Sequence, residues 1–321
     1  MKTLKYITFA FAALSLTACS NDDAPVGEGV AAKITAGLTT SSRAIDANWN
    51  ADVIGVMVAD APTSNMEDLY KNVRYSTTST GTVADFTCPA ADAIFFQEAT
   101  ETVTFTAYAP YQTSAPNALP GANADGIIAV DTENNNTAQL QESIDFIWAT
   151  GAIASRSNPE VSFTGLSSGL DCSFRHKMSR LVLSFTTSTD DGFDADDVFD
   201  VQAYSLDGIA HTGTFNVVTG VAAATDAPKV VSFNGWNSST VGSAVSFKGI
   251  IIPQSANFSV DITINGQHYL TKPYAVTFEP GKTYQYSFKI KKTGIEVIGS
   301  KIIDWEQGVV NSGDAEMPSD N

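Results

Sequence analysis

The feature that most constrains the fold of this 321-residue chain is a repeated alternation of apolar and polar residues. The clearest run is Tyr284–Ile290, where every second residue is aromatic or aliphatic and the residues between them are polar. Similar runs occur at Val260–Ile264, Val103–Ala107 and Val245–Ile251. Because successive side chains of a β-strand point to opposite faces, each run predicts a strand with one buried face.

Turn-forming dipeptides separate these runs. Asn265–Gly266 suits a tight hairpin, Pro280–Gly281 suits a type II turn, and Asp207–Gly208 is a third candidate turn. A helical pattern is confined to a short segment, Ser64–Asn72. Short strands separated by turns at this spacing predict an all-β chain built from β-sandwiches.

The length of the chain favours two domains, because 321 residues exceed what one hydrophobic core normally organises. The stretch Ala109–Gln141 is rich in Asn, Ala, Pro and Gly, and it predicts a long loop with at most one strand, Ile127–Val130. A domain boundary is expected near Gly165–Gly169, where small and polar residues gather.

The first 19 residues have the three parts of an export signal. Lys2 and Lys5 form a basic start, and the apolar stretch Tyr6–Leu16 is shorter than the roughly 20 residues of a membrane-spanning helix. The stretch ends in Leu-Thr-Ala-Cys, which resembles the lipobox of bacterial lipoproteins. We therefore expect cleavage after Ala18 and a lipid on Cys19; the alternative is an ordinary secretory signal that contains a cysteine.

Acidic residues follow the signal and dominate the composition. The segment Ser20–Asp23 resembles the short acidic signal that sends some Gram-negative lipoproteins to the outer face of the outer membrane, although a solvated linker would look the same. The whole chain has 35 acidic and 18 basic residues, for a formal net charge of −17. Such a surface repels phosphate backbones and argues against a nucleic-acid partner.

Two further cysteines, Cys88 and Cys172, lie far apart in the sequence, and neither belongs to a Cys-x-x-Cys pair. A zinc site is therefore not expected. An oxidising compartment would allow a disulfide between them, but two separate buried thiols are the favoured interpretation. We expect no metal and no cofactor.

Residues 30–40 alternate as a single strand near the N-terminus. Its apolar face consists of Val30, Ala32, Ile34, Ala36 and Leu38. A polar connection then leads to Arg43–Ala44, a small-residue sequence that an arginine-specific protease could cut. A cut there would release the strand and leave a hydrophobic groove with unpaired backbone groups, which invites a strand from another molecule. Spacing alone favours the plainer interpretation, in which Arg43 is an ordinary loop residue after the first strand.

Five segments in a fixed order together resemble the fimbrillin family, the lipoprotein (type V) pilins of anaerobic Gram-negative bacteria. They are Trp49–Val56 after Arg43, Phe105–Tyr111, Ile144–Ala149, Phe174–Leu181 and Ile303–Trp305. Each segment is a weak signal by itself, but the ordered set covers nearly the whole mature chain.

The resemblance implies two transthyretin-like β-sandwich domains in tandem. It implies the following division: a signal peptide at 1–18, a lipidated linker with a removable first strand at 19–43, an N-terminal sandwich at 44–165, a C-terminal sandwich at 166–307 and a polar tail at 308–321. It also implies a mechanism in which the lipidated precursor reaches the cell surface, a protease cuts between Arg43 and Ala44, and a strand of another subunit fills the groove.

The implied function is that of a non-enzymatic structural and adhesive subunit of cell-surface fimbriae. Its partners would be other fimbrial subunits, the outer membrane through the lipid on Cys19 before processing, and a host or bacterial surface receptor. Beyond Trp305 the chain offers Val309, Val310 and Met317 in a polar setting, which is a poor donor strand for a stalk subunit. A tip or accessory role stays open, as does a donor strand drawn from residues 295–306.

Three other features of the sequence have plainer structural explanations than a chemical role. Gly165–Gly169 matches the Gly-x-Ser-x-Gly pattern of hydrolases, but that chemistry needs a strand, a turn and a helix around the serine. His176, His211 and His268 share no ligand spacing and are expected to be structural. The run Asp190–Asp200 lacks the glycine and glutamate of a calcium-binding loop, so we expect a solvated acidic loop.

The tryptophans bear on an alternative function. Two of the four lie in alternating or apolar runs and are expected in the core, whereas Trp236 is the best candidate for an exposed aromatic residue. An exposed Trp236 would suit a monomeric glycan-binding surface lipoprotein. A β-sandwich hydrolase is a third class, but the sequence offers no credible carboxylate pair or triad for it.

Overall fold

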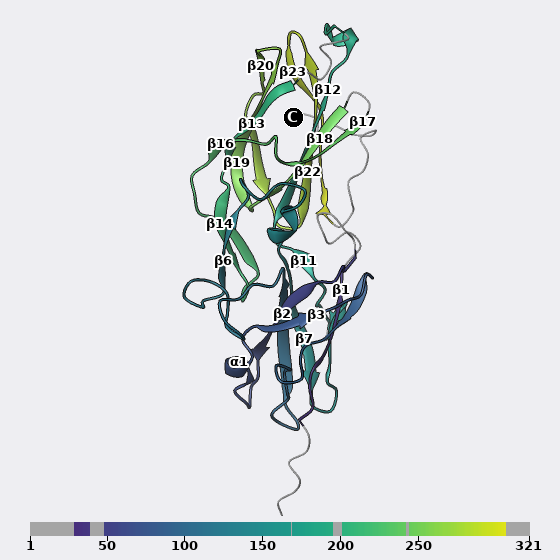
Figure 1. Cartoon of the computed structure of the whole chain (residues 1–321), viewed down its shortest axis with the longest axis vertical. Coiled ribbons are helices and arrows are strands. Elements are labelled where there is room, and N and C mark those ends of the chain that lie inside the picture. The colour runs from purple at the N-terminus through teal and green to yellow at the C-terminus, as the bar shows by residue number, and fades with distance from the viewer. Residues whose placement is uncertain (1–28, 39–47, 168, 195–200, 242–243, 306–321) are drawn as a thin grey trace, which may run out of the picture.

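The computed structural model describes residues 29–38, 48–167, 169–194, 201–241 and 244–305. Figure 1 shows an elongated molecule in which a purple and blue N-terminal half lies end to end with a green and yellow C-terminal half. Strands dominate both halves. Helical structure in these residues consists of α1 (Met66–Leu69), η1 (Gln141–Ser143) and η2 (Thr189–Asp191). The prediction of an all-β chain is confirmed, and α1 lies inside the short helix expected at 64–72.

The N-terminal half consists mainly of two sheets packed face to face. Its strands are β1 (Lys33–Gly37), β2 (Val53–Asp60), β3 (Val73–Ser76), β4 (Val83–Phe86), β5 (Thr102–Ala109), β7 (Ile147–Ser155), β8 (Glu160–Phe163) and β11 (Arg175–His176). One sheet has the order β11-β7-β5-β2-β3, and the other has the order β4-β1-β8. In these two sheets the pair β1–β8 is parallel, and the other neighbours are antiparallel.

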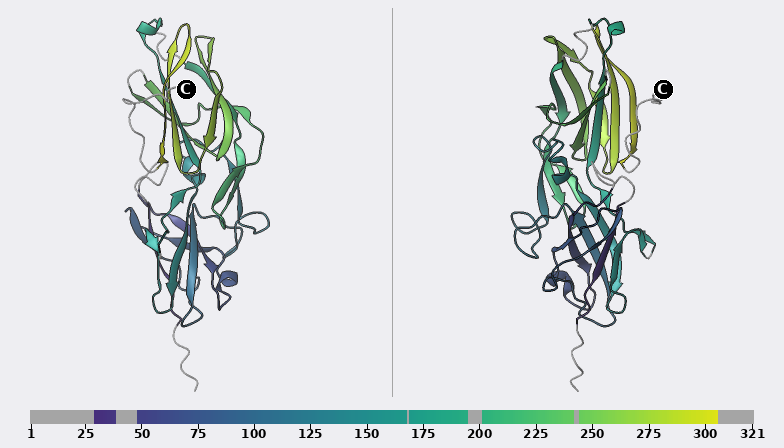
Figure 2. Two further views of the ribbon diagram at one scale, coloured as in Figure 1. Left: turned by 180° about the vertical axis from the view of Figure 1, so that it is seen from behind. Right: turned by 45° about the vertical axis from the view of Figure 1, so that its right-hand side comes forward.

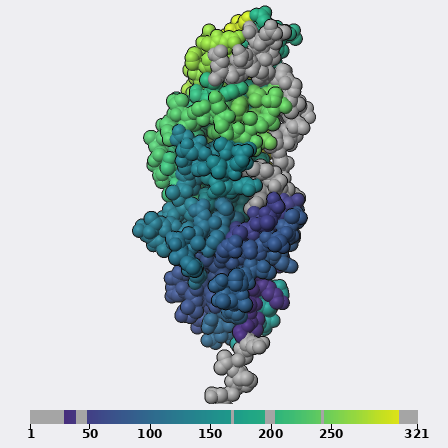
Figure 3. Space-filling model, viewed as in Figure 1, coloured from purple at the N-terminus to yellow at the C-terminus, as the bar shows by residue number. Residues whose placement is uncertain are grey.

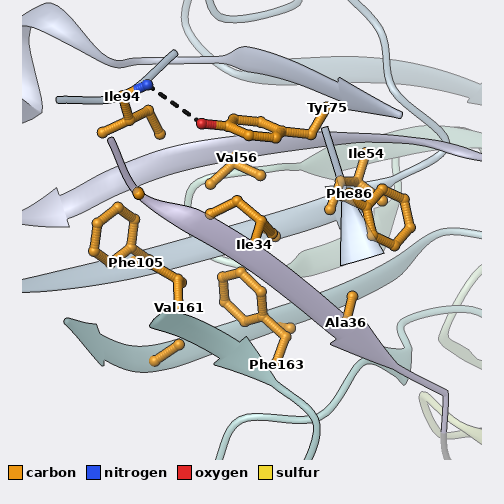
Figure 4. Packing of buried hydrophobic residues seen from close by; sticks show 14 of the residues in the cluster. Ile34, Ala36, Ile54, Val56, Tyr75, Phe86, Ile94, Phe105, Val161 and Phe163 are labelled. Carbon is orange, nitrogen blue, oxygen red and sulfur yellow. Dashed lines mark hydrogen bonds between the residues drawn. The ribbon is translucent and has the colours of Figure 1, made fainter. Parts of the chain in front are cut away.

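A core of aliphatic and aromatic side chains fills the space between these sheets (Figure 4). Ile34 of β1, Phe86 of β4 and Phe163 of β8 meet Val56 of β2 and Phe105 of β5, and none of the five is more than 3% exposed. The alternation in the sequence produces this arrangement because each strand turns its apolar face toward the opposite sheet.

The C-terminal half is a second pair of sheets around its own core. Its strands are β12 (Ser179–Thr186), β13 (Val201–Ile209), β16 (Lys229–Ser232), β17 (Asn237–Val241), β18 (Ala244–Ile251), β19 (Gln254–Ile264), β20 (Gln267–Leu270), β21 (Tyr274–Phe278), β22 (Lys282–Lys291) and β23 (Gly294–Asp304). The orders are β17-β18-β12-β22-β23 and β16-β13-β19-β20, with β21 also paired to β19. Like β1, strand β12 is flanked by one antiparallel neighbour, β18, and one parallel neighbour, β22. The first strand of each half is thus an inner strand of a sheet.

Besides these four sheets, a smaller sheet joins the halves along one side (Figure 2). It contains β6 (Ile127–Asp131), β14 (Thr212–Asn216) and β15 (Val221–Ala224), in the order β15-β14-β6. Strand β6 confirms the one strand expected in the polar stretch 109–141, and it pairs antiparallel with β14 from the C-terminal half. The remaining polar stretch is also anchored there, because the side chain of Asn136 bonds both the N–H (2.5 Å) and the carbonyl (3.0 Å) of Ile250.

Trp305 lies where the two halves meet. Its ring stacks on the imidazole of His176, with the centres 4.0 Å apart, and the guanidinium of Arg180 lies 4.8 Å from the ring centre. The Nδ1 of His176 is 2.6 Å from a carboxylate oxygen of Asp145. Burial lowers the pKa of Arg180 to about 10, although Asp145 favours the charged form. This packing buries Trp305, directly after β23, and Ile303 is buried as well, whereas Asp304 between them is exposed.

Two of the three predicted turns are confirmed, and the third is wrong. Asn265 and Gly266 have φ angles of 48° and 73°, which confirms a tight hairpin between β19 and β20. Gly281 has a φ of 70°, as the predicted type II turn requires. Asp207–Gly208 is not a turn but a bulge inside β13, where a Cβ on Gly208 would stand 2.0 Å from the carbonyl oxygen of Asn257. A glycine is needed there for close backbone approach and not for chain reversal.

Candidate functional site

β1 is hydrogen-bonded along both of its edges. Ile34–Gly37 pair antiparallel with β4, and Lys33–Ala36 pair parallel with β8. The pairing continues beyond the strand, because the N–H of Ala32 donates to the carbonyl of Ile94 at 2.8 Å and the N–H of Leu38 donates to that of Thr82 at 2.8 Å. Removing an inner strand of this kind would leave two unpaired edges facing each other.

The inward face of β1 is apolar, as predicted. Its buried members are Ala32, Ile34, Ala36 and Leu38, and Val30 is half-buried against the same core. Trp49 packs edge-on against Phe86 and Phe174, with ring centres 5.0 and 5.4 Å away. Its Nε1 donates to the carbonyl of Ala36 at 3.0 Å. Loss of β1 would therefore take an acceptor from a fully buried indole as well as expose the core.

The outward face of β1 carries two polar contacts. Lys33 forms an ion pair with Glu160 at 2.8 Å, and the hydroxyl of Thr35 donates to Asp85 at 2.8 Å. Purple atoms from the start of the described chain reach the surface in Figure 3. Exposed pairs of this kind contribute only about 0–1 kcal/mol. Apolar burial and backbone pairing therefore hold β1 in place, and the charges add little.

A cavity of about 560 Å³ flanks β1 on the side of β4. It opens because the chain turns away from β1 after β4: Thr87 pairs with Ser76 of β3, and contact with β1 resumes at Ile94. Cys88 lines the cavity, and its thiol is hydrogen-bonded to the hydroxyl of Tyr75. Burial raises the pKa of the Cys88 thiol, and the hydrogen bond from Tyr75 offsets part of the shift.

We call the space that residues 30–38 occupy between β4 and β8 the β1 slot. β1 is joined to the body of the protein through residues 39–47, and the predicted cleavage site, Arg43–Ala44, falls among them, outside the described residues. The predicted lipid site, Cys19, lies outside them as well. Because β1 is the first strand, one cut between Leu38 and Trp49 would leave it attached by noncovalent contacts alone.

The Gly-x-Ser-x-Gly segment forms a hairpin. Strands β9 (Leu166–Ser167) and β10 (Leu170–Asp171) pair antiparallel, and Ser168 lies outside the described residues. A strand-to-strand hairpin is not the strand–turn–helix setting that a hydrolase nucleophile requires.

The three histidines lie in separate settings: His176 is buried against Asp145, His211 is buried against Thr132, and His268 is exposed beside Asp261. Part of the Asp190–Asp200 run lies outside the described residues; within them, Asp191 pairs with Lys289 at 3.0 Å. The described residues hold no group of three or more acidic, His or Cys side chains placed to bind a metal. They also contain no helix of the length and hydropathy that a membrane crossing requires.

The prediction that Trp236 is exposed is wrong. Its side chain is 4% exposed and packs against Phe233, with ring centres 5.7 Å apart. The indole lies on Gly249 of β18, where an added Cβ would come within 2.2 Å of the ring. The sequence could not indicate this, because the space for the ring is created by a glycine on another strand.

Cys88 and Cys172 are thiols in this structure and do not form a disulfide. Cys88 is half-buried in the cavity beside β1, whereas Cys172 is fully buried.

Three features of the β1 slot had no signal in the sequence: the parallel pairing with β8, the hydrogen bond from Trp49 and the cavity lined by Cys88. Each depends on residues distant in the chain. Only the apolar face of β1 could be identified beforehand, because it depends on local alternation.

Two solved structures share this fold. One is described as a candidate cell adhesion protein from Bacteroides ovatus; it has a TM-score of 0.69 and 24% identity, and the match covers 89% of this chain and 100% of that one. The other, described in the same way, is from Bacteroides uniformis, with a TM-score of 0.61, 24% identity and coverage of 88% and 100%. No curated protein matches the sequence.

The sequence profile of the fimbrillin-like family matches residues 42–305, which is most of the chain. The match begins just after β1 and ends at Trp305, so it takes in both halves and their junction but not β1 itself. The protein therefore belongs to the fimbrillin-like family of structural and adhesion proteins of cell-surface fimbriae.

Proposed function

We propose that this protein is a non-enzymatic fimbrial subunit that is exported as a lipoprotein, cut after Arg43 and joined to other subunits by strand exchange at the β1 slot. The observation that carries the proposal is the position of β1. It is an inner, buried strand, yet a single connection on one side links it to the body of the protein.

The energetics favour a slot that is always filled. Burying Val30, Ile34 and Leu38 contributes roughly 1.5–3 kcal/mol for each side chain that is fully covered. An empty slot would also leave the backbone groups of β4 and β8 unpaired on a hydrophobic surface. A cut strand therefore stays in place until another strand replaces it.

The cavity beside β1 offers a starting point for that replacement. It borders Lys33–Thr35, next to the residues where the partner of β1 changes. A side chain of an incoming strand could enter there and form its first contacts before β1 has left. Stepwise displacement would avoid exposing the whole groove at once.

The slot also restricts the sequence of the incoming strand. Large apolar residues are needed where Ile34 and Leu38 lie, whereas Ala36 is fully buried and leaves room for a small residue only. At Gly37 an added Cβ would stand 3.2 Å from the Cα of Thr164, so a small residue is expected there too.

The lipid and the first strand belong to the same fragment. Cys19 would anchor the precursor to the outer membrane, and a cut after Arg43 would separate residues 19–43 from the body of the subunit. Removal of the strand would thus free the subunit from its own anchor at the moment it becomes able to accept a new strand, and the subunit would pass into the fimbrium at the cell surface.

The test is N-terminal sequencing and intact mass of the protein recovered from surface fimbriae. We expect a chain that begins at Ala44 and migrates in ladders that resist mild denaturation. Arg43→Ala should retain the lipidated Cys19 and form no ladder, whereas the matched control Arg156→Ala should behave as the parent. Assembled fimbriae made of chains that begin at Cys19 would contradict the proposal.

The alternative function, a monomeric glycan-binding lipoprotein that uses an exposed Trp236, loses its proposed binding residue because that indole is buried. Any glycan site must lie elsewhere on the surface.

A further inference from the structure

A second cavity, of about 570 Å³, lies in the N-terminal half between α1, β3 and the segment after β5. Its volume falls within the range of small-molecule sites in proteins. Three aromatic side chains, Tyr70, Phe95 and Tyr111, and two charged ones, Arg74 and Asp92, are among its lining residues.

The walls of this cavity are held in place by internal hydrogen bonds. The hydroxyl of Tyr70 accepts from the N–H of Phe95 at 3.1 Å. The Oδ1 of Asn117 accepts from the N–H groups of Lys71 at 3.0 Å and Asn72 at 3.2 Å. These contacts connect the ends of α1, the segment before β5 and the segment after it, so the cavity is formed before any ligand arrives.

Three polar groups in the cavity have no described partner. Among the residues that the structure describes, the guanidinium of Arg74, the carboxylate of Asp92 and the hydroxyl of Tyr111 take part in no hydrogen bond or ion pair. Arg74 and Asp92 line the same cavity without approaching each other as an ion pair. The cavity therefore offers a ligand one charged hydrogen-bond donor, Arg74, and one charged acceptor, Asp92, next to aromatic rings.

This combination excludes several ligand classes. Asp92 and the net charge of −17 disfavour an anion, and Arg74 disfavours a cation. A purely apolar ligand would desolvate both charged groups without replacing their hydrogen bonds. A sugar ring satisfies all the constraints, because each hydroxyl can both donate and accept and the C–H face of the ring packs on an aromatic side chain.

We propose that this cavity binds a neutral saccharide, with sugar hydroxyls contacting Arg74, Asp92 and the hydroxyl of Tyr111, and with the apolar face of one sugar ring lying on the aromatic lining of the cavity. The site lies next to the β1 slot: it shares Ala93 and Phe95 with the cavity that flanks β1, and Phe95 bridges Ala31. Its polar contacts, Arg74 and Asp92, do not line that other cavity. The site gives the subunit an adhesive activity in addition to its structural role.

The experiment uses the full mature chain on an array of defined neutral, sialylated and sulfated glycans, followed by calorimetric titration of the strongest neutral binder. Arg74→Gln and Asp92→Asn each remove one charge and keep a polar side chain, and Tyr111→Phe removes one hydroxyl. Each should weaken binding on the order of tenfold, the usual effect of losing a hydrogen bond to a charged or buried group. Arg156→Gln and Asp60→Asn, outside the cavity, should leave the affinity unchanged.

Arg74 and Asp92 are exposed, and Tyr111→Phe keeps its ring, so all three variants should melt at the temperature of the parent. The proposal is overturned if no neutral glycan binds, if only sialylated or sulfated glycans bind, or if the three cavity variants bind as tightly as the parent.

Discussion

Ile34→Ala tests how strongly the first strand is held. Ile34 lies at the centre of the inward face of β1, is 2% exposed and packs in the core between the two sheets. Truncating a buried isoleucine to alanine removes the burial of the side chain and leaves a void, at a cost of about 2–5 kcal/mol. The neighbours cannot close the void easily, because strands β4 and β8 on either side fix the position of the backbone.

Urea unfolding followed by tryptophan fluorescence measures this cost, since Trp49 lies against the same strand. We expect the free energy of unfolding of the N-terminal half to fall by about 2–5 kcal/mol. The matched control is Lys33→Ala, which removes only the exposed pair with Glu160 and should cost about 1 kcal/mol or less.

In a chain cut after Arg43, the same loss should weaken retention of the strand. A cost of 2–5 kcal/mol corresponds to an affinity lower by roughly 30-fold to 4,000-fold. When the cut chain carries Ile34→Ala, a labelled peptide 29–43 of the parent sequence should replace the cut strand faster than it does in the parent chain. If Ile34→Ala costs no more than Lys33→Ala in either assay, apolar burial does not hold β1 and the reasoning is refuted.

Three further predictions follow from buried groups elsewhere. Gly249→Ala places a Cβ 2.2 Å from the ring of Trp236 and should lower the melting temperature, whereas an unchanged melting curve would mean that the indole is not packed there. Burial lowers the pKa of His211 to about 4 from 6.5, so on acidification the unfolded state takes up the proton first. The free energy of unfolding should not depend on this group above pH 6.5 and should fall by roughly 3 kcal/mol as the pH drops toward 4. Urea titrations of His211→Gln should not show this loss. Iodoacetamide should modify Cys88 slowly, because burial raises its pKa, but before the fully buried Cys172, and mass spectrometry of peptides would expose the opposite order.

The two halves explain why exchange would concern the first strand only. β12 holds the same kind of inner position in the C-terminal half as β1 holds in the N-terminal half, with one antiparallel and one parallel neighbour. β12 continues into described chain at both ends, so no single cut can release it. β1 has the segment with the predicted lipid site, Cys19, on one side and the connection through residues 39–47 on the other. Under the proposed mechanism, the position of β1 along the chain, and not its packing, is what would allow a single cut to release it.

Much of this molecule follows from local sequence. Period-two alternation identified β1, β5, β18, β19 and β22. It also identified which side chains of β1 face the core, because successive side chains of a strand point to opposite faces. Asn265–Gly266 could be placed in a hairpin because its φ angles are a property of those two residues. The net charge and the prediction of an N-terminal export signal likewise depend on local sequence alone.

Tertiary structure decided which segments meet. Alternation does not specify a strand's neighbours, so neither the parallel pairing of β1 with β8 nor the antiparallel pairing of β6 with β14 across the halves could be anticipated. The burial of Trp236 on Gly249 and the cavity around Arg74 and Asp92 arise from residues brought together from separate strands and loops. The sequence therefore determined the first described strand and the face it turns to the core, and the long-range packing determined the slot that this strand occupies.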